Sequence, residues 1–256
     1  MNRKPLILVT NDDGIEAKGL QALIETVKLF GKVVVVAPAE PQSGMSHAIT
    51  VKKPLQFEKI REEDDVIQYE CMGTPVDCVK IAFNQLLTQK PDLLVSGINH
   101  GSNSSSSVFY SGTMGAALEG CINDVPSIGF SLLSLDPDAD FTASRHFAEK
   151  IIDKVLANGL PKSICLNVNI PPLQKDKIEG IKVARQTKGF WKEEFDKRID
   201  SDGRSYYWLT GYFHNDEPNA PDTDEWALKN NFVSIVPMRV DLTCYDTLKK
   251  IQDWNF

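Results

Sequence analysis

The feature that most constrains the fold is a regular alternation of short apolar runs with amphipathic stretches over the first 170 residues. Such alternation is typical of an α/β protein whose parallel strands are joined by helices. The runs are almost continuous in Val, Ile and Leu, as expected of strands buried on both faces. We therefore predict an α/β fold with a mostly parallel sheet, whose strands are Leu6–Val9, Val33–Ala37, Leu93–Ser96, Ser127–Phe130 and Ile164–Val168.

Helical patterns fill the intervals between the predicted strands. Thr74 followed by Pro75 is an N-cap with proline at the first helical position, and apolar residues follow at helical spacing. Gly159 with Pro161 beyond it is a helix stop signal. The predicted helices cover Gly19–Phe30, a stretch beginning at Pro75, a stretch that Ser111 can cap, and roughly Phe141–Ala157.

A change in composition late in the chain predicts a different kind of element. Between Phe190 and Phe213, 8 of 24 residues are aromatic, against 9% in the whole chain. A turn signal at Asp202-Gly203 lies inside this segment, so we predict a β-hairpin. The aromatic density favours an arm over residues 181–225 that packs on another molecule. A hairpin that covers this chain's own core is the alternative.

The end of the chain is expected to return to the sheet. Asn215–Glu225 has five acidic residues and no Lys or Arg, which is typical of a solvated loop. A helix over Asp224–Asn230 and a strand over Phe232–Val236 are predicted to rejoin the sheet. Because no internal repeat is evident, we predict a single domain over residues 1–256.

Composition and charge exclude several classes of protein. With 42% hydrophobic and 25% charged residues, the chain is expected to fold as a globular protein. Its formal charge of -7 disfavours long nucleic acid, because phosphate backbones select basic surfaces. No run of about 18 apolar residues is present, so no membrane partner is expected. Five scattered cysteines without a CxxC pair predict reduced thiols in a cytoplasmic protein and no zinc site.

The first chemical signal is a pair of acids directly after a predicted strand, in the sequence Asn11-Asp12-Asp13-Gly14. Ligands of parallel sheets bind beyond the carboxyl ends of the strands. Two carboxylates held close together repel each other unless a cation lies between them or one is protonated. A hard divalent metal is therefore the simplest partner for Asp12 and Asp13. A helix cap followed by a turn at Gly14 is the structural alternative.

Three further polar clusters lie at strand ends or at a helix start. Hydroxyl and amide oxygens are ligands for a hard metal, and glycines allow the backbone to approach a ligand closely. Free amides and the dipole at a helix N-terminus bind anions without net basic charge. Each cluster alone can also be explained as a turn or a cap. The members are Ser43 and Gly44; Gly97, Asn99, His100, Gly101 and Asn103; and Ser111, Gly112 and Thr113.

Together, the four clusters on one rim of the sheet predict metal-assisted phosphoryl hydrolysis. A haloacid-dehalogenase-type phosphatase is disfavoured because its first aspartate is replaced by Asn11. A dinucleotide-dependent oxidoreductase is disfavoured because only Gly14 and Gly19 follow the first strand, without the Gly-x-Gly-x-x-Gly motif. A nucleotide sensor without turnover remains the alternative function.

The ordered set of motifs resembles the survival protein SurE family, whose members are metal-dependent nucleotidases. The resemblance rests on Val9 to Gly14, Ala37 to Gly44, Ser96 to Asn103 and Tyr110 to Thr113, with Val233 to Pro237 similar to a late strand motif. It implies a Rossmann-like core with helices on both faces, a protruding hairpin, and a homodimer or homotetramer with exchanged C-terminal segments. The implied substrates are nucleoside 5'-monophosphates, with 3'-monophosphates and polyphosphate as open additions.

The resemblance also implies roles for individual residues. It implies that one Mg2+ or Mn2+ is held by Asp12, Asp13, Ser43 and Asn99, of which Asp12, Asp13 and Asn99 are catalytic. It places the phosphate beside Asn11, Gly44, Gly101, Asn103, Ser111, Gly112 and Thr113.

One segment departs from the family pattern. Many members carry Gly and then acidic residues after the position of Asn103, whereas this chain has Ser104-Ser105-Ser106-Ser107. A role of an acid at that place is therefore absent or taken elsewhere. His100 is a candidate proton donor to the leaving oxygen, with a supporting position beside the site as the alternative. The sequence does not separate a water nucleophile from an aspartate nucleophile.

Overall fold

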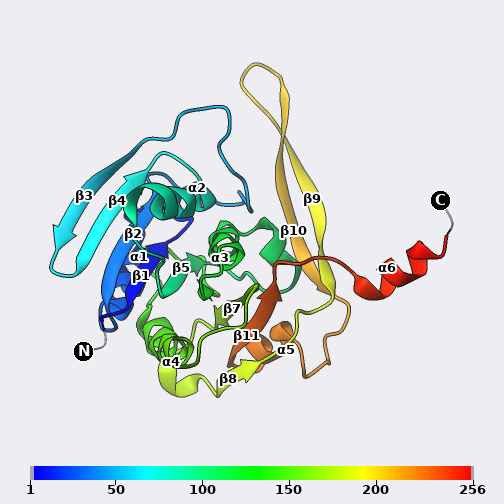
Figure 1. Cartoon of the computed structure of the whole chain (residues 1–256). Helices are drawn as coiled ribbons and strands as arrows, with labels where there is room; N and C mark the ends of the chain where they lie inside the picture. The colour runs from blue at the N-terminus through cyan, green and yellow to red at the C-terminus, as the bar shows by residue number, and fades with distance from the viewer. Residues whose placement is uncertain (1–2, 255–256) are drawn as a thin grey trace.

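The central element of the computed structural model, which describes residues 3–254, is a nine-stranded sheet in the order β3-β4-β2-β1-β5-β6-β7-β11-β8 (Figure 1). Strands β4 to β7 of that order run parallel, whereas β3 and β11 are antiparallel to their neighbours β4 and β7. The bounds are β1 (Leu6–Thr10), β2 (Lys32–Pro38), β3 (Phe57–Glu63), β4 (Val66–Cys71), β5 (Leu93–His100), β6 (Ser127–Leu132), β7 (Ile164–Ile170), β8 (Gly180–Val183) and β11 (Phe232–Arg239).

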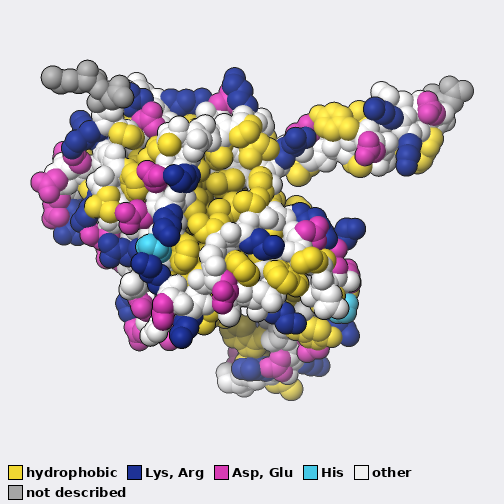
Figure 2. All heavy atoms as spheres, turned by 90° about the horizontal axis from the view of Figure 1, so that it is seen from below, with side chains coloured by type: hydrophobic (Ala, Val, Ile, Leu, Met, Phe, Trp, Pro, Cys, Tyr) yellow, Lys and Arg dark blue, Asp and Glu magenta, His cyan; other side chains and the backbone are white. Residues whose placement is uncertain are grey.

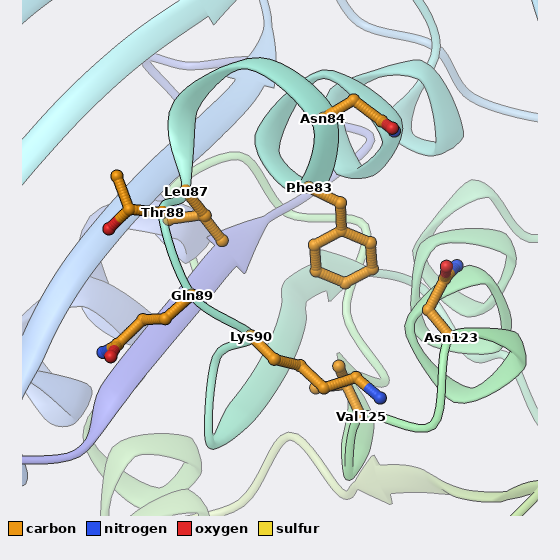
Figure 3. Close-up of a pocket in the computed structure, with 8 residues that line it drawn as sticks. All are labelled: Phe83, Asn84, Leu87, Thr88, Gln89, Lys90, Asn123 and Val125. Atoms are coloured by element: carbon orange, nitrogen blue, oxygen red, sulfur yellow. The ribbon is translucent and has the colours of Figure 1, made fainter.

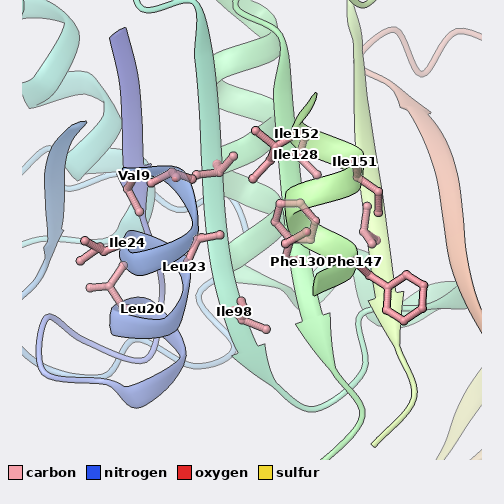
Figure 4. Packing of buried hydrophobic residues seen from close by; sticks show 14 of the residues in the cluster. Val9, Leu20, Leu23, Ile24, Ile98, Ile128, Phe130, Phe147, Ile151 and Ile152 are labelled. Atoms are coloured by element: carbon pink, nitrogen blue, oxygen red, sulfur yellow. The ribbon is translucent and has the colours of Figure 1, made fainter. Parts of the chain in front are cut away.

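Helices cover both faces of the sheet, as predicted (Figure 1). Val9 of β1 packs with α1 (Lys18–Val27) and α4 (Thr142–Asn158) in the larger core cluster, part of which Figure 4 shows. The neighbouring Leu8 faces the other side and packs with α2 (Pro75–Ile81) and α3 (Gly112–Ile122). Successive side chains of a strand point to opposite faces, so one apolar run fills two cores.

The helix boundaries follow the signals in the sequence with small differences. Thr74 and Asp77 form a capping box at the start of α2. The α-helix ends at Ile81, and from Ala82 to Leu86 the chain continues as a π-helical turn. Gly159 closes α4 with a positive φ of 70°, as the stop signal predicted.

The predicted hairpin is present and stands away from the body of the molecule (Figure 1). Strands β9 (Gly189–Ile199) and β10 (Ser205–Asn215) pair antiparallel along their whole length. The predicted turn lies between them, and Gly203 adopts a φ of +79° there. Most aromatic side chains of the hairpin are exposed, with Phe195 at 65% and Trp208 at 57%. The hairpin therefore does not cover the core of this chain.

Some elements were not predicted from the sequence. Every residue of β3 is exposed, so this edge strand has no apolar run to reveal it. The C-terminal helix α6 (Tyr245–Gln252) has no buried residue and extends beyond the body. The remaining elements are α5 (Asp224–Lys229) and two 3-10 segments, η2 (Ser105–Tyr110) and η3 (Lys175–Lys177). The predicted return to the sheet is confirmed, because α5 leads into β11, which pairs with β7. Among the described residues, no helix is long and apolar enough to cross a membrane.

Candidate functional site

The predicted acids lie at the point where the strand order of the sheet reverses. From β1 the chain adds β2 on one side, whereas β5 pairs on the other side, so the carboxyl ends of β1 and β5 flank this position. Such a reversal is where ligands bind in open α/β sheets. Asp12 and Asp13 follow β1, and Asn99 and His100 end β5. The structure therefore brings the first and third polar clusters together.

Asp12 is buried, with 4% of its surface exposed, and points to the start of α3. The Thr113 hydroxyl donates a hydrogen bond of 2.5 Å to Asp12 Oδ1. Burial raises the pKa of Asp12 to about 6, the Thr113 hydrogen bond opposes this shift, and the charge of Asp13 adds to it. Within residues 3–254 no basic side chain forms an ion pair with Asp12. Its charged form therefore lacks a cationic partner.

Asp13 is half-buried and is held by a hydrogen bond from the end of β5. The backbone N–H of His100 donates to Asp13 Oδ2 over 3.2 Å. Burial raises the pKa of Asp13, while the hydrogen bond and positive charge from His100 oppose the shift. Two neighbouring carboxyl groups thus both have a raised pKa, which is the arrangement that a bound cation would relieve.

Asn99 is oriented so that its oxygen is left for a ligand. Its Nδ2 donates to the carbonyl oxygens of His100 and Gly101, over 3.0 and 2.8 Å. Both N–H groups are therefore directed at the backbone, and Oδ1 is the remaining polar atom. Two carboxylates and an amide oxygen form a set of hard oxygen donors that suits Mg2+ or Mn2+. The donor chemistry thus fits the metal that the family resemblance implies.

The loop that carries Ser43 reaches the same rim. The backbone N–H of Gln42 donates to the carbonyl oxygen of Asp12 over 2.7 Å. Ser43 and Gly44 are exposed, and Gly44 has a φ of +76°. The loop is therefore joined to the acids through its backbone, while the Ser43 hydroxyl is accessible.

The start of α3 packs closely against Asp12. A Cβ added at Gly112 would lie 2.8 Å from Asp12 Cβ and 3.0 Å from Oδ2, so glycine is required for this approach. Ser111 caps the helix by accepting from Met114 N over 3.0 Å, as predicted. The positive end of this helix therefore lies at the acid pair.

Asn103 lies in a separate, buried network of asparagines. Its backbone N–H donates to Asn169 Oδ1, its side chain donates to Ser131, and its carbonyl oxygen accepts from Asn167, each over 2.8 Å. Asn169 in turn donates to Asn167 over 2.9 Å. These contacts fix the loop from Gly101 to Asn103 against β6 and β7. The predicted phosphate role of Asn103 stays a prediction.

Other predicted residues have a mainly local role in the described structure. Asn11 is buried and donates to the carbonyl oxygen of Gly14 over 2.8 Å, so it shapes the turn after β1. His100 packs edge-on against Phe141, and its Nδ1 is buried without a hydrogen-bond partner among the described residues. His214 is exposed. The five cysteines are free, and all but Cys244 are buried.

An ion cluster around the buried Glu119 was not predicted from the sequence. Glu119, which is 5% exposed, accepts from His47 Nε2 over 3.0 Å and from Lys80 Nζ over 2.7 Å. The hydrogen bond from His47, together with Lys80, lowers the pKa of Glu119 to about 2 despite its burial. This cluster fixes the Ser43 loop to α3, because His47 follows Ser43 by four residues. Glu119 lies inside a helical pattern, so no sequence signal distinguished it.

The predicted solvated loop over 215–225 is found at Asp216 and Asp222, which are exposed, but not at the last two acids, which begin α5. Asp224 is 1% exposed and Glu225 is half-buried. Glu225 accepts a hydrogen bond from Ser104, and Asp224 accepts one from the backbone N–H of Ser105 over 2.8 Å. The acids turn inward because the serine run offers them hydroxyl and amide donors.

A pocket lies at the opposite edge of the sheet, where the parallel strands begin. It encloses about 360 Å³ beside the amino end of β5, below the π-helical turn (Figure 3). Its lining is Phe83, Asn84, Leu87, Thr88, Gln89, Lys90, Asn123 and Val125, none of which belongs to the four polar clusters. Because parallel sheets bind ligands beyond the carboxyl ends of their strands, we place the site at the acid pair.

The chain is similar over most of its length to proteins of one family. A sequence model of the family described as "Survival protein SurE" matches residues 7–193. A protein of Flavobacterium johnsoniae named 5'-nucleotidase SurE is 54% identical over 99% of this chain and 98% of its own length. One of Bacteroides fragilis with the same name is 46% identical over 99% of both chains. The crystal structure of the SurE protein from Aquifex aeolicus superposes with a TM-score of 0.85 at 40% identity, covering 98% of this chain and 100% of that one.

Proposed function

The chain belongs to the survival protein SurE family, and we propose that it is a metal-dependent 5'-nucleotidase that hydrolyses nucleoside monophosphates to nucleoside and phosphate. The observation that carries this proposal is the pair of carboxyl groups at the end of β1, both with a raised pKa, beside the N-terminus of α3. The names of the relatives support the same activity.

The proposed metal ligands are Asp12, Asp13, Ser43 and Asn99, with Mg2+ or Mn2+ as the ion. Support comes from the accessible hydroxyl of Ser43, the free Oδ1 of Asn99 and the uncompensated acid pair. When bound, the cation supplies positive charge against the phosphoryl oxygens. Among residues 3–254 no cluster of three His, Cys, Asp or Glu side chains occurs, so a site made only of those residue types is absent there.

The residues of the chain position the groups that react. The Thr113 hydroxyl fixes the orientation of Asp12, and the His100 amide fixes Asp13. The first turn of α3 presents Gly112 and Thr113 to the phosphate, with the positive end of the helix dipole behind them. In the proposed reaction a water oxygen bonds to phosphorus and the water gives up one proton, while the ester P–O bond breaks and the released nucleoside oxygen takes up one proton, so that the overall reaction consumes one water. His100 remains the candidate donor of that proton.

The test is phosphate release from a panel of 5'- and 3'-nucleoside monophosphates and polyphosphate. We expect turnover of 5'-monophosphates with Mg2+ or Mn2+ and none after treatment with EDTA. Binding of a nucleotide without any phosphate release in the presence of either metal would instead identify a sensor. A bell-shaped pH profile that is unchanged in His100→Asn would dismiss the proton-donor role.

We also propose a homodimer or homotetramer in which the arm and the C-terminal segment contact partner subunits. The exposed aromatic side chains of β9 and β10 and the absence of buried residues in α6 support this proposal. Seen from below, hydrophobic side chains gather in the middle of the body, and the C-terminal helix stands clear of it (Figure 2). Light scattering should give a dimer or tetramer for the full chain, and a monomer would contradict the proposal.

Two remaining predictions concern organisation and location. We take residues 1–256 as one domain, in which the arm predicted over residues 181–225 contains the β9–β10 hairpin. A cytoplasmic location stays a prediction, and the free, mostly buried cysteines support it.

A further inference from the structure

We infer that Asp224 is a positioning residue for phosphate binding, because it holds the loop that follows Asn103 in place from the base of the hairpin. This inference rests on the proposed function for its substrate. It concerns the Ser104–Ser107 run, which departs from the family pattern and to which the proposed mechanism assigns no role.

Ser105 has an unfavourable backbone conformation that its neighbours hold in place. Its φ is 51°, in the left-handed region that side chains rarely adopt. Every polar group of this residue is held: its N–H donates to Asp224 Oδ2 over 2.8 Å, its hydroxyl donates to the Thr187 carbonyl over 2.9 Å, and its carbonyl accepts from Gln186 over 2.9 Å. An unfavourable backbone conformation persists only where the surroundings enforce it. Here the enforcing residues belong to the base of the hairpin and to α5.

Asp224 accepts hydrogen bonds on both of its carboxylate oxygens. Its Oδ1 accepts from the backbone N–H and the hydroxyl of Thr187, over 2.9 and 2.5 Å, and from the N–H of Glu225 over 2.8 Å. Its Oδ2 is directed at Ser105. Among the described residues no Lys, Arg or His forms an ion pair with it. The carboxylate therefore acts as a hub of four donors that joins the loop after Asn103 to the hairpin base.

The serines on either side of Ser105 also form hydrogen bonds to α5 and to the hairpin. Ser104 donates to Glu225, and its own hydroxyl also lies 2.5 Å from that of Ser102. Trp191 of β9 donates to Ser107 over 3.1 Å. Asn103 is thus held directly by the asparagines of β7, and the hub holds Ser105, two residues further along the chain. Catalytic geometry is sensitive to displacements of about 1 Å, so release of Ser105 should be felt at Asn103.

The test is the variant Asp224→Asn, which keeps the shape of the side chain but replaces one acceptor oxygen by an NH2 group. The NH2 group then faces either the three donors at the Oδ1 position or the Ser105 N–H at the Oδ2 position. Because an NH2 group cannot accept a hydrogen bond, the bonds at that position are lost. We expect KM for a nucleoside 5'-monophosphate and Kd for inorganic phosphate to rise roughly tenfold to a hundredfold. We expect kcat to fall by a smaller factor and Mn2+ affinity to stay as in the wild type. A role in folding alone would not produce this separation.

The matched control is Asp222→Asn. Asp222 is also at the hairpin base, but it is exposed and pairs with Arg185 over 2.7 Å, away from the serine run. It should leave KM, the phosphate Kd and kcat unchanged. If Asp224→Asn does not fold, Thr187→Val removes one donor of the hub and should give a weaker change of about threefold in the same direction.

The outcomes separate this inference from the proposed function. A folded Asp224→Asn variant with the wild-type KM and phosphate Kd would overturn the inference while leaving the nucleotidase intact. Wild type that binds inorganic phosphate but releases none from nucleotides would defeat the proposed function, and weaker phosphate binding in the variant would still support the inference. Failure of the wild type both to bind phosphate and to release it from nucleotides would overturn both.

Discussion

Two buried acids at opposite ends of α3 behave in opposite ways. Asp12 lies at the first turn, where it receives one hydroxyl hydrogen bond and the charge of a second acid, and its pKa rises to about 6. Glu119 lies in the last turn, where His47 and Lys80 both contact it, and its pKa falls to about 2. Both side chains are almost inaccessible to solvent, but desolvation dominates at the more deeply enclosed Asp12, whereas the hydrogen bond from His47, with Lys80, outweighs desolvation at Glu119.

This contrast distinguishes an acid whose charge is compensated within the protein from an acid whose charge is available to a bound cation. Glu119 is compensated within the protein and holds the Ser43 loop in place. Asp12 is left without a cation within the described residues, at the carboxyl end of a strand. Perturbed acids that the fold does not compensate are concentrated at functional sites.

The largest effect should come from removing either charge of the acid pair. Asp12→Asn and Asp13→Asn should each lower phosphate release by a factor of about a thousand or more, because the site then loses an anionic metal ligand. Circular dichroism should show an unchanged fold. A variant that keeps wild-type turnover with added metal would remove that residue from the site.

Although Asp12→Asn should abolish activity, it should raise the free energy of unfolding of the metal-free protein at high pH. The folded pKa of Asp12, about 6, lies above its ordinary value of 3.8, so ionisation destabilises the folded state. The cost is absent below about pH 3.8, develops up to pH 6 and is on the order of 3 kcal/mol above it. In EDTA, Asp12→Asn should therefore be more stable than the wild type at pH 8 and equal to it near pH 3.5. Urea unfolding measures this, and equal stability at pH 8 would contradict the raised pKa.

Removing the charge of Glu119 should destabilise the protein. Its folded pKa of about 2 lies below the ordinary 4.5, so its ionised form stabilises the fold above pH 4.5, and this stabilisation is lost as the pH falls toward 2. Glu119→Gln should lower the free energy of unfolding at pH 7 by about 2 kcal/mol, because the half-exposed His47 and Lys80 are partly screened. Turnover should fall less than tenfold. A loss of turnover as large as that of Asp12→Asn would contradict the distinction between Glu119 as a structural acid and Asp12 as an acid of the site.

The smallest effect is expected at Ser105. Ser105→Gly relieves the left-handed backbone but removes the hydrogen bond to Thr187, so the two changes nearly cancel. The free energy of unfolding should change by less than about 0.5 kcal/mol. Ser105→Ala, which keeps the strain and loses the bond, should cost about 1 kcal/mol more. Equal stabilities of the two variants would contradict an enforced conformation.

The parts of the molecule that the sequence could predict are those with a local signal. Buried parallel strands such as β1 are recognisable in the sequence as continuous apolar runs. The cap at Thr74 and the stop signal at Gly159 mark helix ends. The meeting of Asp13 with β5 could also be expected, because parallel strands end at one rim. An exposed edge strand such as β3 has no such signal.

The parts that could not be predicted depend on contacts distant in sequence. Nothing near Asp224 indicates that a serine more than a hundred positions earlier will donate to it. The pairing of His47 with Glu119 likewise depends on how the Ser43 loop packs on α3. In both cases the acid belongs to an unremarkable local pattern, and only the tertiary fold decides whether it is solvated, compensated or left for a ligand.

The most direct measurement is the binding of Mn2+ by calorimetry to the metal-free wild type, Asp12→Asn, Asp13→Asn and Glu119→Gln at one pH. We predict one site in the wild type and in Glu119→Gln, and no measurable site in the two aspartate variants. Binding by Asp12→Asn as tight as that of the wild type would contradict the claim that the acid pair after β1 is the metal site of a nucleotidase.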